Sequence, residues 1–221
     1  MPEWVRPVAE QMFEVGLRET LKLAGFALVG STVIGIVLGT LLTIRWLPLR
    51  APIRLYIEVW RGLPIVVTLL LLYSLPNADP RFSGLGAFGA AAIGLVLWGS
   101  AQVAETTRGA VQSIPREQHE AAAALGFGWV GRHAFVILPQ ALRRLLPPLV
   151  GLLVNVLQNT TIAFVLGVNE LLQAGQRQSE LLGFETGDSH SFAILGAVLV
   201  VFFLLSFPLT RLAAYLERKL I

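Results

Sequence analysis

The chain has 221 residues, of which 55% are hydrophobic and only 14% are charged, and its formal net charge is +3. Because an ordinary soluble domain carries about 25% charged residues, this composition excludes that class and indicates one compact membrane domain. The chain contains no cysteine, which excludes disulfides and thiolate metal sites.

The first segment, residues 1–22, is mixed and charged and lacks the apolar core of a signal peptide. Its apolar residues, among them Val8, Met12 and Val15, recur roughly at helical spacing. We therefore predict a helical lead-in that lies on the membrane surface. The remaining residues, 23–221, are predicted to form the membrane domain.

Five stretches of this domain reach the roughly 20 mostly apolar residues that a membrane-crossing helix needs. Helices satisfy their own backbone hydrogen bonds in lipid, so we predict an all-α membrane protein with five transmembrane helices. In the first of them, Gly35 and Gly39 form a small-xxx-small pair that permits close helix contact. In the second, Glu58 and Arg61 are three residues apart and are predicted to pair on one helix face. The five spans cover residues 23–44, 53–75, 85–110, 145–168 and 192–212.

Basic residues are concentrated in alternate connections between these spans. The positive-inside rule therefore predicts that the N-terminus is outside and the C-terminus is cytoplasmic, which agrees with an odd number of spans. The basic groups lie between spans one and two (Arg45, Arg50, Arg54), between spans three and four (Arg116, Arg132, Arg143, Arg144) and after span five (Arg211, Arg218, Lys219).

On this topology a polar segment between spans three and four, residues 115–139, faces the cytoplasm. Arg116 to Leu125 is predicted to form a short helix with Pro115 near its start. Gly126 is placed to end it, since glycine adopts the left-handed cap conformation easily. The small side chains of residues 121–124 suit a helix that seats in a groove of a partner, and Glu120 would pair with basic groups.

The spacing within this segment resembles the cytoplasmic signature of ABC-importer permeases. Glu120-Ala121-Ala122 is followed by Gly126 and then by Leu138-Pro139, with Val136 where the family has isoleucine. Further motifs, in order over residues 15–218, are similar to those of the polar amino acid permease family: Arg61-Gly62-Leu63-Pro64, Ala104-Glu105-Thr106-Thr107-Arg108-Gly109, Ser113-Ile114-Pro115, Leu138-Pro139-Gln140-Ala141, Thr160-Thr161 and Glu170-Leu171. The chain departs from the usual family residues at Gln102, Gln158 and Glu117-Gln118.

The resemblance implies a type I ABC importer-like permease, multi-pass in a bacterial plasma (inner) membrane and surrounded by the lipid bilayer. Its implied partners are a cytoplasmic ATPase, a second permease subunit (a copy or a paralogue) and an extracytoplasmic solute-binding protein that delivers an amino acid. No nucleic acid is implied. The residues implied in coupling to the ATPase are Glu120, Ala121, Ala122, Leu125 and Gly126.

ATP chemistry is expected in the partner rather than in this chain. A phosphate-binding loop needs Gly-Lys-Ser/Thr, and neither lysine of the chain follows a glycine. Its three histidines are scattered without a metal-ligand pattern. We therefore expect no enzyme activity, no cofactor and no metal here, with ATP and magnesium bound by the ATPase.

Polar residues inside spans three and four suggest a substrate path, since such residues usually face a bundle interior or a water-filled cavity. The alternatives are structural: Glu105 can pair with Arg108, and amides can hold membrane helices together. The outer connection, residues 169–191, either docks the binding protein or is a solvated connector. A stand-alone secondary transporter and a non-transport scaffold remain alternative functions. The candidate path residues are Gln102, Glu105, Asn155, Gln158, Asn159, Thr160 and Thr161.

Overall fold

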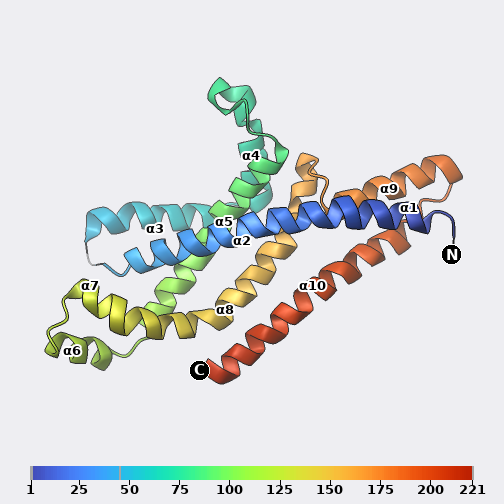
Figure 1. The fold of residues 1–221 in the computed structure, drawn as a ribbon. Coiled ribbons are helices and arrows are strands. Elements are labelled where there is room, and N and C mark those ends of the chain that lie inside the picture. The colour runs from blue at the N-terminus through green and yellow to red at the C-terminus, as the bar shows by residue number, and fades with distance from the viewer. Residues whose placement is uncertain (1, 45, 221) are drawn as a thin grey trace. The chain divides into compact units, whose positions relative to one another are not determined.

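The computed structural model describes residues 2–44 and 46–220, and these residues contain helices and no strand. Arg45, predicted to belong to the first basic cluster, lies outside the described residues. The chain forms two compact units, whose elements can be followed in Figure 1. Unit 1 comprises Met1–Val29, Leu63–Val96 and Asn155–Pro208, and unit 2 comprises Gly30–Gly62, Leu97–Val154 and Leu209–Ile221.

The N-terminal lead-in is helical, as predicted, and continues into the first span without interruption. α1 (Val5–Glu10) is followed by the π-helix η1 (Gln11–Leu17) and by α2 (Arg18–Leu41), which together make one helix of 37 residues. No proline interrupts residues 8–41, so nothing stops the helix at residue 22. The division of the chain into a surface segment and a membrane domain at that point stays a prediction.

The prediction that the second span, residues 53–75, is one continuous helix is wrong. The structure has two helices, α3 (Leu47–Gly62) and α4 (Ile65–Ala78), separated at Leu63 and Pro64. Proline disfavours the helical conformation of the residue before it, and Pro64 itself is extended, with ψ 126°. By length and composition the described residues contain four helices able to cross a membrane, or five if this pair is one broken span.

The remaining spans follow the predicted order with shifted bounds. Span three is α5 (Ala87–Gln112), and span five is α10 (Ser191–Leu220). Span four begins well before residue 145, because α7 (Trp129–Arg132) and the π-helix η3 (His133–Ile137) lead directly into α8 (Leu138–Asn159) and the 3₁₀ helix η4 (Thr160–Leu166). The short elements are η2 (Pro80–Phe82), α6 (Arg116–Ala124) and α9 (Leu171–Thr186).

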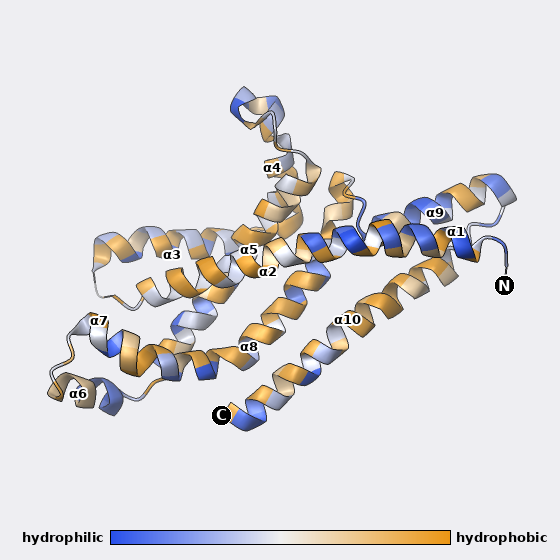
Figure 2. Cartoon of the chain, viewed as in Figure 1, coloured by the Kyte–Doolittle hydropathy of each residue, from blue (hydrophilic) through white to orange (hydrophobic). Residues whose placement is uncertain are grey.

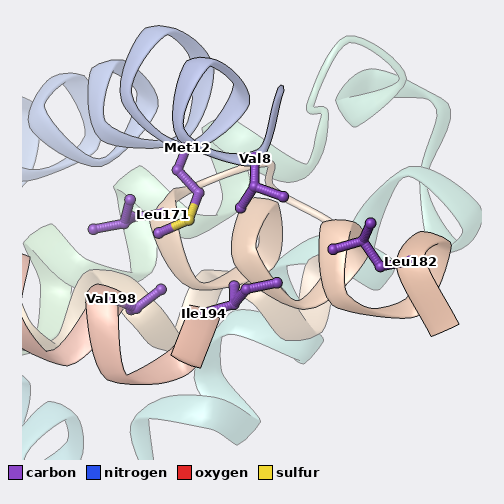
Figure 3. Close-up of a cluster of buried hydrophobic side chains, with 6 residues drawn as sticks. All are labelled: Val8, Met12, Leu171, Leu182, Ile194 and Val198. Carbon is purple, nitrogen blue, oxygen red and sulfur yellow. The ribbon is translucent and has the colours of Figure 1, made fainter. Parts of the chain in front are cut away.

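The core of unit 1 joins the N-terminal helix to α9 and α10. Val8 and Met12 meet Leu171 and Leu182 of α9 and two residues of α10, as Figure 3 shows. Gly16 allows the close approach, since a Cβ there would lie 2.8 Å from the Cβ of Ala174. The six buried members are Val8, Met12, Leu171, Leu182, Ile194 and Val198.

The core of unit 2 depends on close packing of α2 against α5. A Cβ on Gly35 would lie 2.5 Å from the Cβ of Val103, and one on Gly39 would meet the carbonyl oxygen of Ala104. The predicted small-xxx-small contact is therefore confirmed, and its partner is α5.

Apolar side chains also cover much of the outer surface, as expected for a protein whose solvent is lipid. Leu199, Phe203 and Leu204 of α10 are 69%, 56% and 62% exposed. Hydrophobic residues predominate along α10, whereas its C-terminal end is hydrophilic (Figure 2). This pattern fits a helix that faces hydrocarbon and ends in the polar interface.

Candidate functional site: the α6 elbow and the polar helix faces

The helix predicted between spans three and four is present with the predicted bounds to within one residue. α5 ends at Gln112, Pro115 stands before α6 in an extended conformation (ψ 146°), and α6 covers Arg116–Ala124. Gly126 is left-handed, with φ 84°. Its N–H donates to the Ala123 carbonyl at 2.9 Å, and the Phe127 N–H donates to the Ala122 carbonyl at 3.1 Å. These two bonds form a Schellman motif, which satisfies carbonyls that a helix end otherwise leaves unpaired.

The predicted coupling residues divide between an exposed face and a buried one. Ala122 is 2% exposed, whereas Leu125 is 79% exposed. Glu120, Ala121 and Gly126 are also exposed. α6 thus uses its small Ala122 to pack on its own unit and presents the other four residues, which we name the coupling surface, to the outside.

Side chains of α7, η3 and α8 hold α6 in place. The Gln140 Nε2 donates to the Gln118 Oε1 at 3.1 Å, and the Arg132 Nη1 donates to the His119 carbonyl at 3.4 Å. The His133 ring stacks on Trp129 at 4.1 Å and meets His119 edge-on at 6.0 Å. α6 is therefore fixed to the helical segment that continues into α8.

Burial lowers the pKa of His119, and the neighbouring His133 and Arg132 lower it further. A neutral imidazole suits this position, because a second positive charge beside Arg132 would be unfavourable.

Two exposed apolar residues beside the coupling surface were not predicted. Val130 and Phe135 are 72% and 73% exposed, although they lie in helices that carry Arg132 and His133. Both are apolar residues within a polar segment of the sequence, which is the signal that could have identified them. They lie outside the motif formed by Glu120 through Gly126 and by Pro139. Such exposed apolar groups next to α6 are typical of a surface that a partner covers.

In span three, Glu105 is surrounded by arginines. Arg108 makes the two shortest contacts with it, 2.5 Å from its Nη2 to Oε1 and 3.0 Å from its Nε to Oε2. Arg54 and Arg61 of α3 approach the same carboxylate at 3.7 and 4.0 Å. The Arg61 Nε also donates to the Gln102 Oε1 at 3.2 Å. The structural alternative for Glu105, an ion pair with Arg108, is present.

The predicted Glu58–Arg61 pair is wrong. Glu58 instead accepts from the Arg54 Nε at 2.6 Å, because residues four apart on a helix also share one face and Arg61 turns towards Gln102 and Glu105 on α5.

The span-four candidates belong to unit 1, whereas Gln102 and Glu105 belong to unit 2. Asn155 and Gln158 are exposed, and Asn159 is half-buried. Their threonine neighbours are engaged locally: the Thr160 hydroxyl donates to the Leu157 carbonyl at 2.7 Å and the Thr161 hydroxyl to the Gln158 carbonyl at 2.8 Å. A shared cavity between the two polar faces stays a prediction.

The connection predicted to lie outside, residues 169–191, contains the helix α9, which packs on the N-terminal helix of unit 1. Glu170 caps α9, its carboxylate accepting from the Leu172 and Gln173 N–H groups at 2.9 and 2.8 Å. Burial raises the pKa of Glu170 to about 7, although these two bonds lower it. The neighbouring Leu171 N–H donates to the Thr20 hydroxyl at 3.0 Å. A well-packed helix excludes the solvated-connector reading, while docking of a binding protein stays a prediction.

The long apolar helices define a class: an integral membrane protein with several membrane-spanning helices. Residues 31–221 match the family model described as binding-protein-dependent transport system inner membrane component. The chain belongs to that family, so it is the multi-pass permease component of such a transporter. Dependence on a binding protein implies that protein and an ATPase as partners, and the ATPase is a separate subunit.

Similar proteins carry related names. The glutamine transport system permease protein GlnP of Escherichia coli is 35% identical over 209 residues, which cover 93% of this chain and 91% of GlnP. The probable amino-acid ABC transporter permease protein PatM of Vibrio harveyi is 34% identical over 205 residues, covering 92% of this chain and 89% of PatM. A crystal structure of an amino acid ABC transporter with histidines matches with a TM-score of 0.82, 28% identity and full coverage of both chains.

Proposed function

We propose that the chain is the permease subunit of an ATP-driven importer of polar amino acids and that α6 is its docking element for the ATPase. The observation that carries the proposal is α6 itself, a capped helix whose Glu120, Ala121, Leu125 and Gly126 are exposed beside the apolar Val130 and Phe135. The names of GlnP and PatM support an amino acid as the substrate.

The assembly we propose contains a second permease subunit, cytoplasmic ATPase subunits that bind ATP and magnesium, and an extracytoplasmic binding protein. The N-terminus is outside and the C-terminus cytoplasmic. The concentration of arginines around α6 and at the end of α10 supports this orientation. The coupling surface then faces the same compartment as ATP.

In the mechanism we propose, α6 transmits movement of the ATPase to the membrane helices. The Schellman turn and the contacts of Gln118 and His119 with Gln140 and Arg132 join α6 to the segment that begins α8. A displacement of α6 is therefore passed on to that segment rather than lost in a loose loop. ATP binding would bias two stable packings of the permease, as alternating access requires.

The substrate path we propose includes Gln102, Glu105, Asn155, Gln158, Asn159, Thr160 and Thr161. Around Glu105, the arginines Arg54, Arg61 and Arg108 face two carboxylates, those of Glu58 and Glu105. This excess of positive charge favours an approaching carboxylate over an ammonium group. The α-carboxylate of an amino acid is the group we expect near Arg61 and Gln102.

Co-purification with the cognate ATPase tests the proposal. Glu120→Lys reverses a charge on the coupling surface, and Glu117→Lys makes the same change on the same helix at an exposed position outside that surface. We expect the ATPase to co-purify with the wild type and with Glu117→Lys but not with Glu120→Lys. Equal recovery with all three chains, or with none, would overturn α6 as the docking element.

A further inference from the structure

Unit 2 contains a cavity that the transport mechanism above does not use. It has a volume of about 440 Å³ and lies between α5, α8 and the end of α10. This volume is within the range of about 300–1,000 Å³ that is typical of ligand pockets. Figure 1 shows these elements as the green α5, the yellow to orange α8 and the red C-terminal end of α10. Its lining residues are Thr106, Gly109, Ala110, Ser113, Arg144, Pro148 and Leu220.

The polar end of the cavity is cationic. The Arg144 Nη1 donates to the Ser113 carbonyl at 2.5 Å and to its hydroxyl at 3.1 Å. None of the described lining residues is acidic, and Arg144 forms no ion pair with any residue in the described part of the chain. Two hydroxyl groups, those of Ser113 and Thr106, lie in the same wall, but they donate to the Ala110 and Gln102 carbonyls at 2.8 and 2.9 Å. The Arg144 guanidinium bonds Ser113 through its Nη1 alone, so its remaining N–H groups are the donors that suit a phosphate.

Further positive charge surrounds the cavity. Arg143 is exposed next to Arg144, and Leu220 brings the last turn of α10, with Arg218 and Lys219, to the same cavity. One carboxylate, that of the exposed Glu217, accompanies them on this turn. Among the described residues, neither Arg143, Arg218 nor Lys219 pairs with it.

The other walls are apolar or small. Gly109, Ala110, Pro148 and Leu220 offer no charge, and a Cβ placed on Gly109 would meet nothing within 4 Å. A site with a cationic end and apolar walls, set between membrane helices, matches a ligand that is itself anionic at one end and apolar at the other. A free anion would gain nothing from the apolar walls.

We propose that this cavity binds the phosphate headgroup of an anionic phospholipid from the cytoplasmic leaflet, with Arg144 at the phosphate and the acyl chains along Ala110, Pro148 and Leu220. Basic pockets between membrane helices on the cytoplasmic side are suited to such headgroups. Arg144 also donates to the carbonyl of Ser113, directly after the end of α5. The bound lipid therefore stiffens the turn between α5 and α6. Only the choice of leaflet rests on the proposed topology.

The test measures how much phosphatidylglycerol binds to the purified full chain. The lipid is titrated into the chain in detergent micelles, and its occupancy is read by native mass spectrometry. Phosphatidylcholine serves as the competitor. Two variants alter the cavity in different ways. Arg144→Gln removes the charge, and Gly109→Leu fills the cavity without changing the charge. Arg143→Gln is the matched control, because it removes an adjacent exposed arginine that does not line the cavity.

We expect Arg144→Gln and Gly109→Leu each to weaken phosphatidylglycerol binding about fivefold, and Arg143→Gln to weaken it less than about twofold. Equal loss in Arg143→Gln would reduce the effect to diffuse surface charge and overturn the site. So would equal binding of phosphatidylcholine, displacement of the lipid by inorganic phosphate alone, or unchanged binding in Gly109→Leu. The measurement uses no ATPase, so its failure leaves the proposed transport function untouched.

Discussion

Alanine in place of Gly126 is expected to loosen the turn that ends α6. Gly126 has φ 84°, a conformation that costs a residue with a Cβ about 1–2 kcal/mol. A Cβ at this position would meet nothing within 4 Å, so steric crowding adds no further cost. The whole effect of Gly126→Ala therefore comes from the backbone.

This cost changes how often the Schellman turn opens. A free energy of 1–2 kcal/mol corresponds to a factor of about 5–30 in an equilibrium. Hydrogen exchange of the chain in lipid nanodiscs measures this opening through the N–H groups of Gly126 and Phe127, which donate to Ala123 and Ala122. In Gly126→Ala we expect the residue 126 and Phe127 amides to exchange about 5- to 30-fold faster.

Two variants serve as controls. Gly126→Asn should recover much of the protection, because asparagine tolerates the left-handed conformation. Gly128→Ala should exchange like the wild type, since Gly128 has φ −64° and a Cβ there would also meet nothing. Wild-type exchange rates in Gly126→Ala, or an equal acceleration in Gly128→Ala, would refute the assignment of the turn to Gly126.

Further outcomes are expected at other positions. Gly39→Val should lower the melting temperature in detergent, because its side chain would meet Ala104 and Thr107. Gly25→Val is the control and should leave the melting temperature unchanged, because there is open space around Gly25. Equal effects of the two substitutions would contradict the α2–α5 packing. Because the pKa of Glu170 is raised to about 7, the folded chain binds a proton that the unfolded chain releases above its ordinary pKa near 4.5. The stability of the folded chain should therefore fall as the pH rises from about 4.5 to 7. Glu170→Gln should flatten the plot of melting temperature against pH in this range. An unchanged slope in this variant would show that Glu170 does not cause the fall.

The sequence predicted α6 well because its determinants are local. A proline before the helix, a run of alanines and a glycine after it all act within one or two turns. The second span was predicted poorly because averaged hydropathy hides a single proline, and Pro64 separates two helices of quite different character. The α3 half carries buried Ile53 and Ile57 on one face and arginines elsewhere, whereas the α4 half is mostly apolar and carries no charged residue.

Contacts between helices that are distant in the sequence could not be predicted from local residue spacing. The small residues of the first span predicted a close contact, but nothing in their spacing identified α5 as the partner. Likewise, i,i+3 spacing correctly suggested Arg108 for Glu105, while the approach of Arg54 and Arg61 depends on how α3 packs on α5. The same packing moved Arg61 away from Glu58. Contacts between helices therefore decided which of several local options was realised.

The π-helix Gln11–Leu17 has a consequence for the spacing of buried residues along the N-terminal helix. Val8, Met12, Gly16 and Thr20 are all buried, at a strict interval of four residues. In an α-helix of 3.6 residues per turn each such step would rotate the side chain by about 40°, so the row would wind away from its neighbour. The wider π-turn offsets this rotation and keeps the row straight along α9. Deleting one residue within Gln11–Leu17 would let this segment return to an α-helix, and the shortened stretch between Val8 and Thr20 would then rotate Val8 by only about 20°. The π-helix thus accommodates one additional residue without moving Val8 away from Leu171 and Leu182.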